Sequence, residues 1–296
     1  GFLGRALLEQ LVRRSGGAGG RLVVPTRRAG RGDLVRALPT VEVVLGEFDE
    51  PARLDTLFFA ADPARRIDAV INLVGILHGS KERFEEVHVA LPRRLAQAAL
   101  HAGVRRFVHV SALGAGAGSD APSQYLRSKA AVEAALRALP LDLTVLRPSV
   151  LFGREDRFVN TFAALQRWLP LLLVPGANAR FQPAWVEDVA LALARCLDEP
   201  STAGQTFELA GPEVLKLREI VQRAGRIAGC ERPVIGAPAF LGRLQAALMS
   251  LLPGEPLLSA DNLDSMKLPN VAGGKLPGLA ELGITPSGMM QIVPSY

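Results

Sequence analysis

Short apolar runs alternate with amphipathic segments about every thirty residues as far as residue 148, and this alternation constrains the fold more than any other feature. The runs expected to be strands are 21–26, 41–48, 68–74, 107–110 and 143–146. Successive strand–helix–strand units make right-handed crossovers, which produce a parallel sheet covered by helices on both faces. The nearly all-apolar run 68–74 is typical of such a buried strand. We therefore expect an α/β fold with a doubly wound parallel sheet.

The amino terminus has the pattern of a phosphate-binding turn. Gly1, Phe2, Leu3 and Gly4 lead into an amphipathic run over 5–14, and a glycine-rich turn that enters a helix lets backbone amides approach a pyrophosphate. Such a turn follows the first strand of a dinucleotide-binding sheet. We therefore expect that this strand lies upstream of residue 1 and is missing from the chain, which would leave a gap in mid-sheet. A helix start with a flexible terminus is the other interpretation.

Two arginines stand where a dinucleotide fold selects its cofactor. Arg27 and Arg28 directly follow the run 21–26, and the next carboxylate is Asp33. At this position an acidic residue accepts a hydrogen bond from the ribose 2′-hydroxyl of NAD(H), whereas arginine accommodates the 2′-phosphate of NADP(H). The sequence therefore favours NADP(H), with NAD(H) as the alternative cofactor. An ordinary pair of loop arginines is the other interpretation.

Further cofactor contacts are expected where later strands end, because ligands of such sheets bind beyond the carboxyl ends of the strands. Asp49 follows the third strand, where it could meet the edge of an adenine ring or cap the next helix. Leu73, Val74 and Gly75 end the fourth strand, and glycine lets the chain approach a ligand closely. Pro148 follows the sixth strand.

A tyrosine and a lysine four residues apart provide a candidate acid/base pair. Tyr125 and Lys129 fall at the start of a helix predicted over 124–137, where this spacing places them on one face. The ammonium group can then favour the ionised phenol. Ser111, just after the fifth strand, is the third candidate for catalysis. A solvated helix face is the other interpretation of the pair.

Composition excludes several classes of function. The net charge is +5, but the arginines are scattered and only 5% of the residues are aromatic, so nucleic acid is not an expected partner. Cys196 and Cys230 are the only cysteines and form no C-x-x-C pattern. We therefore expect no disulfide framework and no metal site, and a reducing, cytoplasmic location. No apolar run approaches the roughly eighteen residues of a spanning helix.

One long helical segment is predicted between the fourth and fifth strands. Apolar residues recur at helical spacing over 82–102, and Pro92 inside this range predicts a kink or a restart. His88 and His101 lie on the same segment. We assign neither histidine a role, because a lone helical histidine is usually structural.

Beyond residue 150 the alternation weakens. Residues 1–150 are therefore expected to form a Rossmann-like dinucleotide-binding domain, and 151–296 a smaller C-terminal α/β subdomain for substrate or partner, partly interleaved with the first. Helices are predicted over 159–168 and 217–227, and a third is predicted to be capped by Asp188. A strand is predicted over 205–209. The tail, which includes 264–268 and 276–283, is loop-rich and is not expected to supply catalytic groups.

The segment 240–252 is predicted as an amphipathic helix with two interpretations. Its apolar face either packs on the core of the protein or contacts a membrane or partner. The pattern alone leaves both open.

The chain resembles the extended and atypical short-chain dehydrogenase/reductases. The resemblance covers nearly the whole chain and rests on the turn at Gly1 and Gly4, the strand end 72–75, the pair Tyr125/Lys129, and the string 146–148 followed by 152–153. The longer strings YLRSK (125–129), FGREDRF (152–158), MKLP (266–269) and LPGL (276–279) are similar to the nucleotide-binding accessory subunits of respiratory complex I and their bacterial relatives.

This resemblance implies a mechanism and a departure from it. In the wider family the tyrosine moves a proton, the lysine lowers the pKa of the tyrosine and holds the nicotinamide ribose, and a serine or threonine on the fifth strand orients the substrate. Here that serine position falls on Ala112, with Ser111 one residue early. On a strand this shift points a side chain to the other face.

The resemblance therefore implies an NADP(H)-binding protein whose cofactor serves structure or redox sensing. Its expected partners are respiratory complex I or a membrane surface, contacted through the C-terminal subdomain, and its expected place is the cytoplasm or the inner face of the bacterial inner membrane. The alternative is an active NAD(P)-dependent reductase or a nucleotide-sugar epimerase/dehydratase that uses Tyr125 and Lys129.

Overall fold

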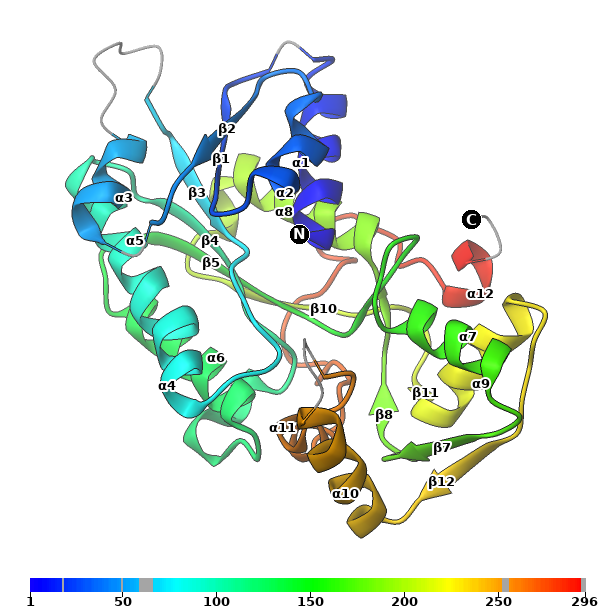
Figure 1. Cartoon of the computed structure of the whole chain (residues 1–296). Coiled ribbons are helices and arrows are strands. Elements are labelled where there is room, and N and C mark those ends of the chain that lie inside the picture. Colours follow the sequence, from blue (N-terminus) through cyan, green and yellow to red (C-terminus); the bar gives the residue numbers. More distant parts are fainter. Residues whose placement is uncertain (18, 49, 59–65, 252–255, 294–296) are drawn as a thin grey trace.

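A computed structural model describes residues 1–17, 19–48, 50–58, 66–251 and 256–293 (Figure 1). Its strands are β1 (Leu22–Thr26), β2 (Val41–Leu45), β3 (Ala69–Asn72), β4 (Arg106–Val110), β5 (Asp142–Pro148), β6 (Leu151–Phe152), β7 (Leu172–Pro175), β8 (Arg180–Phe181), β9 (Ala184–Trp185), β10 (Thr206–Leu209), β11 (Leu215–Lys216) and β12 (Val234–Ala237). Its longer α-helices are α1 (Phe2–Arg14), α2 (Ala29–Arg36), α3 (Pro51–Phe58), α5 (Leu91–His101), α6 (Gln124–Arg137), α7 (Val159–Trp168), α8 (Val186–Asp198), α9 (Leu217–Ile227) and α10 (Ala239–Ser250). Shorter helical segments are α4 (Lys81–Phe84), η2 (Glu85–Ala90), η3 (Ala115–Asp120), η4 (Pro200–Thr202), α11 (Ala260–Ser265) and α12 (Met289–Ile292).

A four-stranded parallel sheet in the order β10-β5-β4-β3 is covered by helices on both faces. We call this sheet and its helices the first lobe. Alternate residues of β4 face opposite layers: Phe107 packs on α3, α5 and α6, whereas Val108 and Val110 pack on α1 and α8. Figure 1 shows these helices on the two faces of the sheet. Apolar side chains on both faces of one strand require this double cover. The predicted doubly wound parallel α/β fold is therefore confirmed.

The first two strands form a separate sheet. β1 and β2 are parallel, with Leu22 opposite Val41. Within the described ranges neither strand pairs with the four-stranded sheet.

The helical segment around Pro92 is continuous, and of the predicted kink or restart it shows the restart, because the α-helix α5 begins at Leu91 after a π-helical segment. α4 leads into the π-helical segment η2, and α5 begins at Leu91. Proline has no amide hydrogen, and its ring clashes with the carbonyl one turn earlier in an α-helix. The wider π turn before Pro92 moves that carbonyl away, so the segment stays helical.

The elements α7, α9, β7 and β12 surround a separate hydrophobic core, and we call them the second lobe. β7 and β12 are parallel partners. Two elements of the later sequence instead complete the first lobe, since β10 pairs with β5 and α8 covers one face of the sheet. No helix within the described ranges is long and apolar enough to cross a membrane.

Asp188 does not cap α8, contrary to the prediction. The helix begins at Val186, which places Asp188 in its first turn. Its carboxylate accepts hydrogen bonds from the amide and the hydroxyl of Ser287, at 2.7 and 3.3 Å. The residue therefore ties the tail of the chain to α8.

Candidate functional site

The predicted cofactor residues converge on one cavity of about 3030 Å³. The lining includes Gly1, Phe2, Leu3, Gly4, Arg27, Arg28, Leu73, Val74, Gly75, Ser111, Tyr125, Lys129 and Pro148. Asp49 lies outside the described residues. The cavity is larger than the roughly 300–1,000 Å³ of a typical ligand site, because it extends from the space beside β1 to the second lobe. The structure thus brings together the residues singled out from the sequence, while their individual roles stay predictions.

The start of α6 is fixed by two caps. Ser123 Oγ accepts a hydrogen bond from the Leu126 amide at 3.2 Å. The carboxylate of Asp261, on α11, accepts hydrogen bonds from the amides of Gln124 and Tyr125 at 2.6 and 3.0 Å. A negative charge at the amino end of a helix is stabilising, since the first amides have no partner within the helix. The tail of the chain therefore positions the helix that carries Tyr125.

Lys129 is buried one turn into the same helix. Its Nζ donates a hydrogen bond to the Val110 carbonyl at 3.2 Å. Burial lowers the pKa of Lys129 to about 8, and the charge of Glu133 opposes this shift. A Cβ atom on Gly75 would lie 3.3 Å from Nζ and 3.6 Å from His88 Nε2. Glycine at position 75 thus leaves the ammonium group room beside the cavity.

Burial raises the pKa of Tyr125 to about 12. The expected lowering of this pKa by Lys129 is not present in the structure. The physical reason is the position of the ammonium group, which bonds to the Val110 carbonyl. Within the described part of the chain, no hydrogen bond joins the Lys129 ammonium group to the Tyr125 phenol. The Tyr125 ring instead lies edge-on to His88, with ring centroids 5.6 Å apart.

His88 packs against the Tyr125 ring and is linked through Ser128 to the Tyr125 carbonyl. The sequence alone did not predict this role. His88 Nε2 accepts a hydrogen bond from the Ile76 amide at 2.9 Å, so the ring proton must be on Nδ1. Nδ1 then donates to Ser128 Oγ at 2.8 Å, and the Ser128 hydroxyl donates to the Tyr125 carbonyl at 2.8 Å. Burial and the charge of Lys129 lower the pKa of His88 to about 3. The imidazole therefore stays neutral and links the loop after β3 to α6.

The burial of His88 could have been predicted from helical spacing. Phe84, Val87 and His88 share one buried helix face. A histidine on an apolar face needs partners for its ring nitrogens, and this requirement was the available signal.

A second buried pair holds the end of β3. Asn72 Nδ2 lies 3.0 Å from His109 Nδ1, and Asn72 Oδ1 accepts a hydrogen bond from the Val74 amide at 3.1 Å. The amide nitrogen of Asn72 can only donate, so the His109 proton is on Nε2. Burial lowers the pKa of His109 well below its usual value, with the charge of Lys129 as the next cause. These bonds hold the residues before Gly75 in place.

Ser111 and Ala112 occupy different environments. Ser111 is buried, and its Oγ has no hydrogen-bond partner among the described residues. Ala112 belongs to a small apolar cluster with Ala121 and Leu126, against which Tyr125 packs. The cluster that packs on Tyr125 therefore has a methyl group at position 112 and no hydroxyl.

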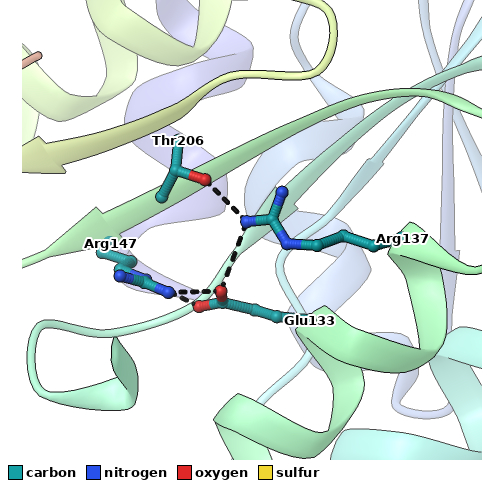
Figure 2. Close-up of polar contacts among 4 residues, drawn as sticks. All are labelled: Glu133, Arg137, Arg147 and Thr206. Atoms are coloured by element: carbon teal, nitrogen blue, oxygen red, sulfur yellow. Dashed lines mark hydrogen bonds and ion pairs between the residues drawn. The ribbon is translucent and has the colours of Figure 1, made fainter. Parts of the chain in front are cut away.

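A buried ion pair fixes α6 on the sheet (Figure 2). Arg147, at the end of β5, donates two hydrogen bonds to the carboxylate of Glu133, from Nε at 2.9 Å and from Nη2 at 2.6 Å. Arg137 Nη2 lies 3.5 Å from the same carboxylate and donates to Thr206 Oγ1 at 2.6 Å. The hydrogen bond to Glu133 raises the pKa of Arg147. This bidentate pair sets the register of α6, and hence of Lys129, against β5 and β10.

Arg27 and Arg28 are exposed at the end of β1. The Arg28 amide donates to Thr26 Oγ1 at 3.3 Å, which shapes the turn into α2. Within the described ranges neither guanidinium forms an ion pair. A Cβ atom on Gly4 would lie 3.5 Å from a methyl group of Leu73. This is an ordinary van der Waals distance, so Gly4 near the start of α1 lies next to Leu73, just after β3.

Comparison with known proteins agrees with this geometry. Residues 1–169 match the model of a family described as NAD(P)H-binding. The chain is 33% identical over 294 residues to the mitochondrial NADH dehydrogenase [ubiquinone] 1 alpha subcomplex subunit 9 of Rattus norvegicus, covering 97% of this chain and 74% of that protein. It is 30% identical over 239 residues to a ceramide reductase of Caulobacter vibrioides, covering 80% of this chain and 71% of the reductase.

The fold is also found among solved structures. An NADPH-dependent quinone oxidoreductase from Escherichia coli, complexed with NADPH, superposes with a TM-score of 0.74 at 17% sequence identity. The superposition covers 99% of this chain and 95% of that one. At this level of identity the similarity concerns the fold alone.

Proposed function

The chain belongs to the NAD(P)H-binding family, and from this premise we propose that it binds NADP(H) and holds it for structure or redox sensing. The observation that carries this proposal is the convergence of the predicted cofactor residues on one cavity. Gly75 leaves space beside Lys129, because a Cβ atom there would lie 3.3 Å from the ammonium nitrogen. Bound nicotinamide would supply hydride chemistry, while the residues described here bind and orient it.

Arg27 and Arg28 support NADP(H) over NAD(H). Both are exposed, line the cavity and are free of ion pairs with other described residues, so they are available for a 2′-phosphate. We expect the double variant Arg27→Ala/Arg28→Ala to weaken NADPH binding about tenfold or more and to leave NADH binding nearly unchanged. Isothermal titration calorimetry measures both. Arg93→Ala is the control, because Arg93 is exposed and absent from the cavity lining. Tighter binding of NADH than NADPH by the wild type would contradict the proposed preference.

Ala112 supports a cofactor without efficient turnover. A methyl group provides no hydrogen bond to a substrate oxygen, and loss of one such donor typically reduces a rate by about a hundredfold or more. We expect the purified full-length protein to retain NADPH and to show no turnover with carbonyl compounds, quinones or sugar nucleotides. Turnover that is abolished by Tyr125→Phe would overturn this part of the proposal.

The alternative function is that of an active reductase. The pair Tyr125 and Lys129 favours it, together with the name of the Caulobacter relative, a ceramide reductase. Because the pKa of Lys129 is lowered to about 8, its ammonium form can release a proton near neutral pH. An active reductase would turn over a carbonyl substrate in the wild type and lose that turnover in Tyr125→Phe, whereas a protein that only binds the cofactor would show no turnover in either.

We propose that respiratory complex I is the partner of this protein. The rat relative is a subunit of NADH dehydrogenase [ubiquinone]. A peripheral position on the inner face of the bacterial inner membrane, with contact through the C-terminal residues, is part of this proposal. Affinity purification from detergent-solubilised membranes tests it, with co-purification of NADH dehydrogenase activity as the expected result. Recovery of the protein entirely in the soluble fraction, free of that activity, would contradict it.

A further inference from the structure

Helix α10 packs on the protein with its small residues and exposes its large ones. Gly242 and Ala246 are buried on one side of the helix. A Cβ atom on Gly242 would lie 2.7 Å from the side chain of Pro175 at the end of β7, so only glycine allows this contact. The opposite side carries Phe240, Leu244 and Leu248, which are 68%, 55% and 58% exposed. The core-facing interpretation of this helix from the sequence is therefore wrong.

The exposed apolar residues extend beyond the helix. Leu251, just after α10, is 81% exposed. Leu173 of β7 and Ile235 of β12 are opposite each other in the parallel pair, and both are exposed. The strand β7 and the helix adjoin, since α10 packs on β7 through Gly242. We call the set Phe240, Leu244, Leu248 and Leu251 the α10 surface. Figure 1 shows α10 and β12 together at one end of the molecule.

The segment that carries this surface has positive charge and no carboxylate. Residues 232–254, which include β12 and α10, contain Arg232 and Arg243 without any Asp or Glu. The acidic residues of the neighbouring helix α11 are engaged. Asp264 pairs with Arg243 at 3.7 Å and with Lys267 at 2.6 Å, and Asp261 accepts hydrogen bonds from the amides of α6.

We propose that the α10 surface lies on a lipid bilayer that contains anionic lipid. An aliphatic helix face flanked by arginines is the composition of helices that lie in the membrane interface, where the apolar side chains enter the acyl boundary and the cations meet lipid phosphates. A protein partner would instead be expected to meet a rim of polar hydrogen-bonding groups. The α10 surface is mainly leucine. This proposal deepens the peripheral position given above and does not depend on NADP(H) binding.

Vesicle co-sedimentation of the full-length protein tests the proposal. The vesicles are phosphatidylcholine alone, or phosphatidylcholine mixed with phosphatidylglycerol. The wild type is expected to bind the mixed vesicles more tightly and to lose part of this affinity in high salt. Leu244→Gln/Leu248→Gln should bind about a hundredfold more weakly, since two leucine side chains no longer enter the apolar layer.

The control variant is Val214→Gln/Met290→Gln. Both residues are exposed, and Met290 lies on α12, apart from α10 in Figure 1. It should bind vesicles as the wild type does. Thermal unfolding and NADPH titration of each variant show that the fold and the cofactor site are intact, so a failure of NADPH binding is recorded separately from a failure of vesicle binding.

Other occupants of the surface give different results. No binding to either vesicle, or equal binding by both double variants, overturns the proposal. A wild-type dimer in light scattering that Leu244→Gln/Leu248→Gln dissociates, without vesicle binding, assigns the surface to a second copy of the chain. Loss of complex I co-purification in that variant, without vesicle binding, assigns it to a protein partner.

Discussion

Removal of the Asp261 carboxylate should loosen the start of α6 without unfolding the protein. Asp261 accepts charge-assisted hydrogen bonds from two amides, at 2.6 and 3.0 Å. Loss of a helix cap typically costs about 0.5–2 kcal/mol, and the second cap, Ser123, remains. We therefore expect Asp261→Ala to favour local opening by about 1–2 kcal/mol, which is a factor of roughly 5–30 in the opening equilibrium.

Amide hydrogen exchange measures this opening. The amides of Gln124 and Tyr125 should exchange faster by that factor, whereas protection in the middle of α6 should be unchanged. Asp261→Asn keeps one carbonyl acceptor and should give a smaller effect. Asp264→Ala is the matched control on the same helix, because Asp264 pairs with Arg243 and Lys267 and does not contact α6. Unchanged exchange of the two amides in Asp261→Ala would refute the reasoning.

Two further predictions concern pH. Burial lowers the pKa of Lys129 to about 8 from 10.5, so between these values the unfolded chain binds more protons and the free energy of unfolding should rise with pH, by on the order of 3 kcal/mol. Urea denaturation should show this rise in the wild type and in the exposed control Lys267→Met, but not in Lys129→Met. The pKa of His88 is lowered to about 3 from 6.5, mainly by burial, so the free energy of unfolding should fall as pH drops from 6.5 towards 3. His88→Gln should flatten that part of the urea-derived profile, and an unchanged slope would show that the ring is charged in the folded protein.

Local patterns predicted the elements of the fold well. The predicted helices 124–137, 159–168 and 217–227 have the same bounds as α6, α7 and α9. Each is amphipathic along its whole length, and a serine cap at 123 marks the start of the first. The alternation of strands and helices was sufficient for the fold class, because right-handed crossovers leave few other arrangements.

The site was predictable from two patterns. Positions that follow strand ends share one edge of the sheet by topology, so they converge on the cavity. Tyr125 and Lys129 were predicted instead from their spacing of four on one helix. Asp261 was missed because it reaches Tyr125 across 136 positions of sequence from a tail that was expected to be loop-rich. His88 was left without a role because its partners, Ile76 and Ser128, belong to other segments.

The sequence pattern also could not predict which face of α10 packs on the protein. Helical periodicity identifies an apolar face, but it does not say which face meets the protein. In this case the close fit of Gly242 against Pro175 decides the orientation.

The pairing of β10 with β5 has a consequence for how the chain folds during synthesis. β5 ends at residue 148, but its outer edge is covered only when Thr206–Leu209 has been made, and the sheet face under α8 is covered only after residue 198. A nascent chain that stops between these points presents an open strand edge and an apolar sheet face that α1 covers without α8, and such exposed edges and apolar surfaces promote aggregation. A fragment cut near residue 150 should inherit the same defect, so the nucleotide-binding lobe should be produced only together with the residues that follow it.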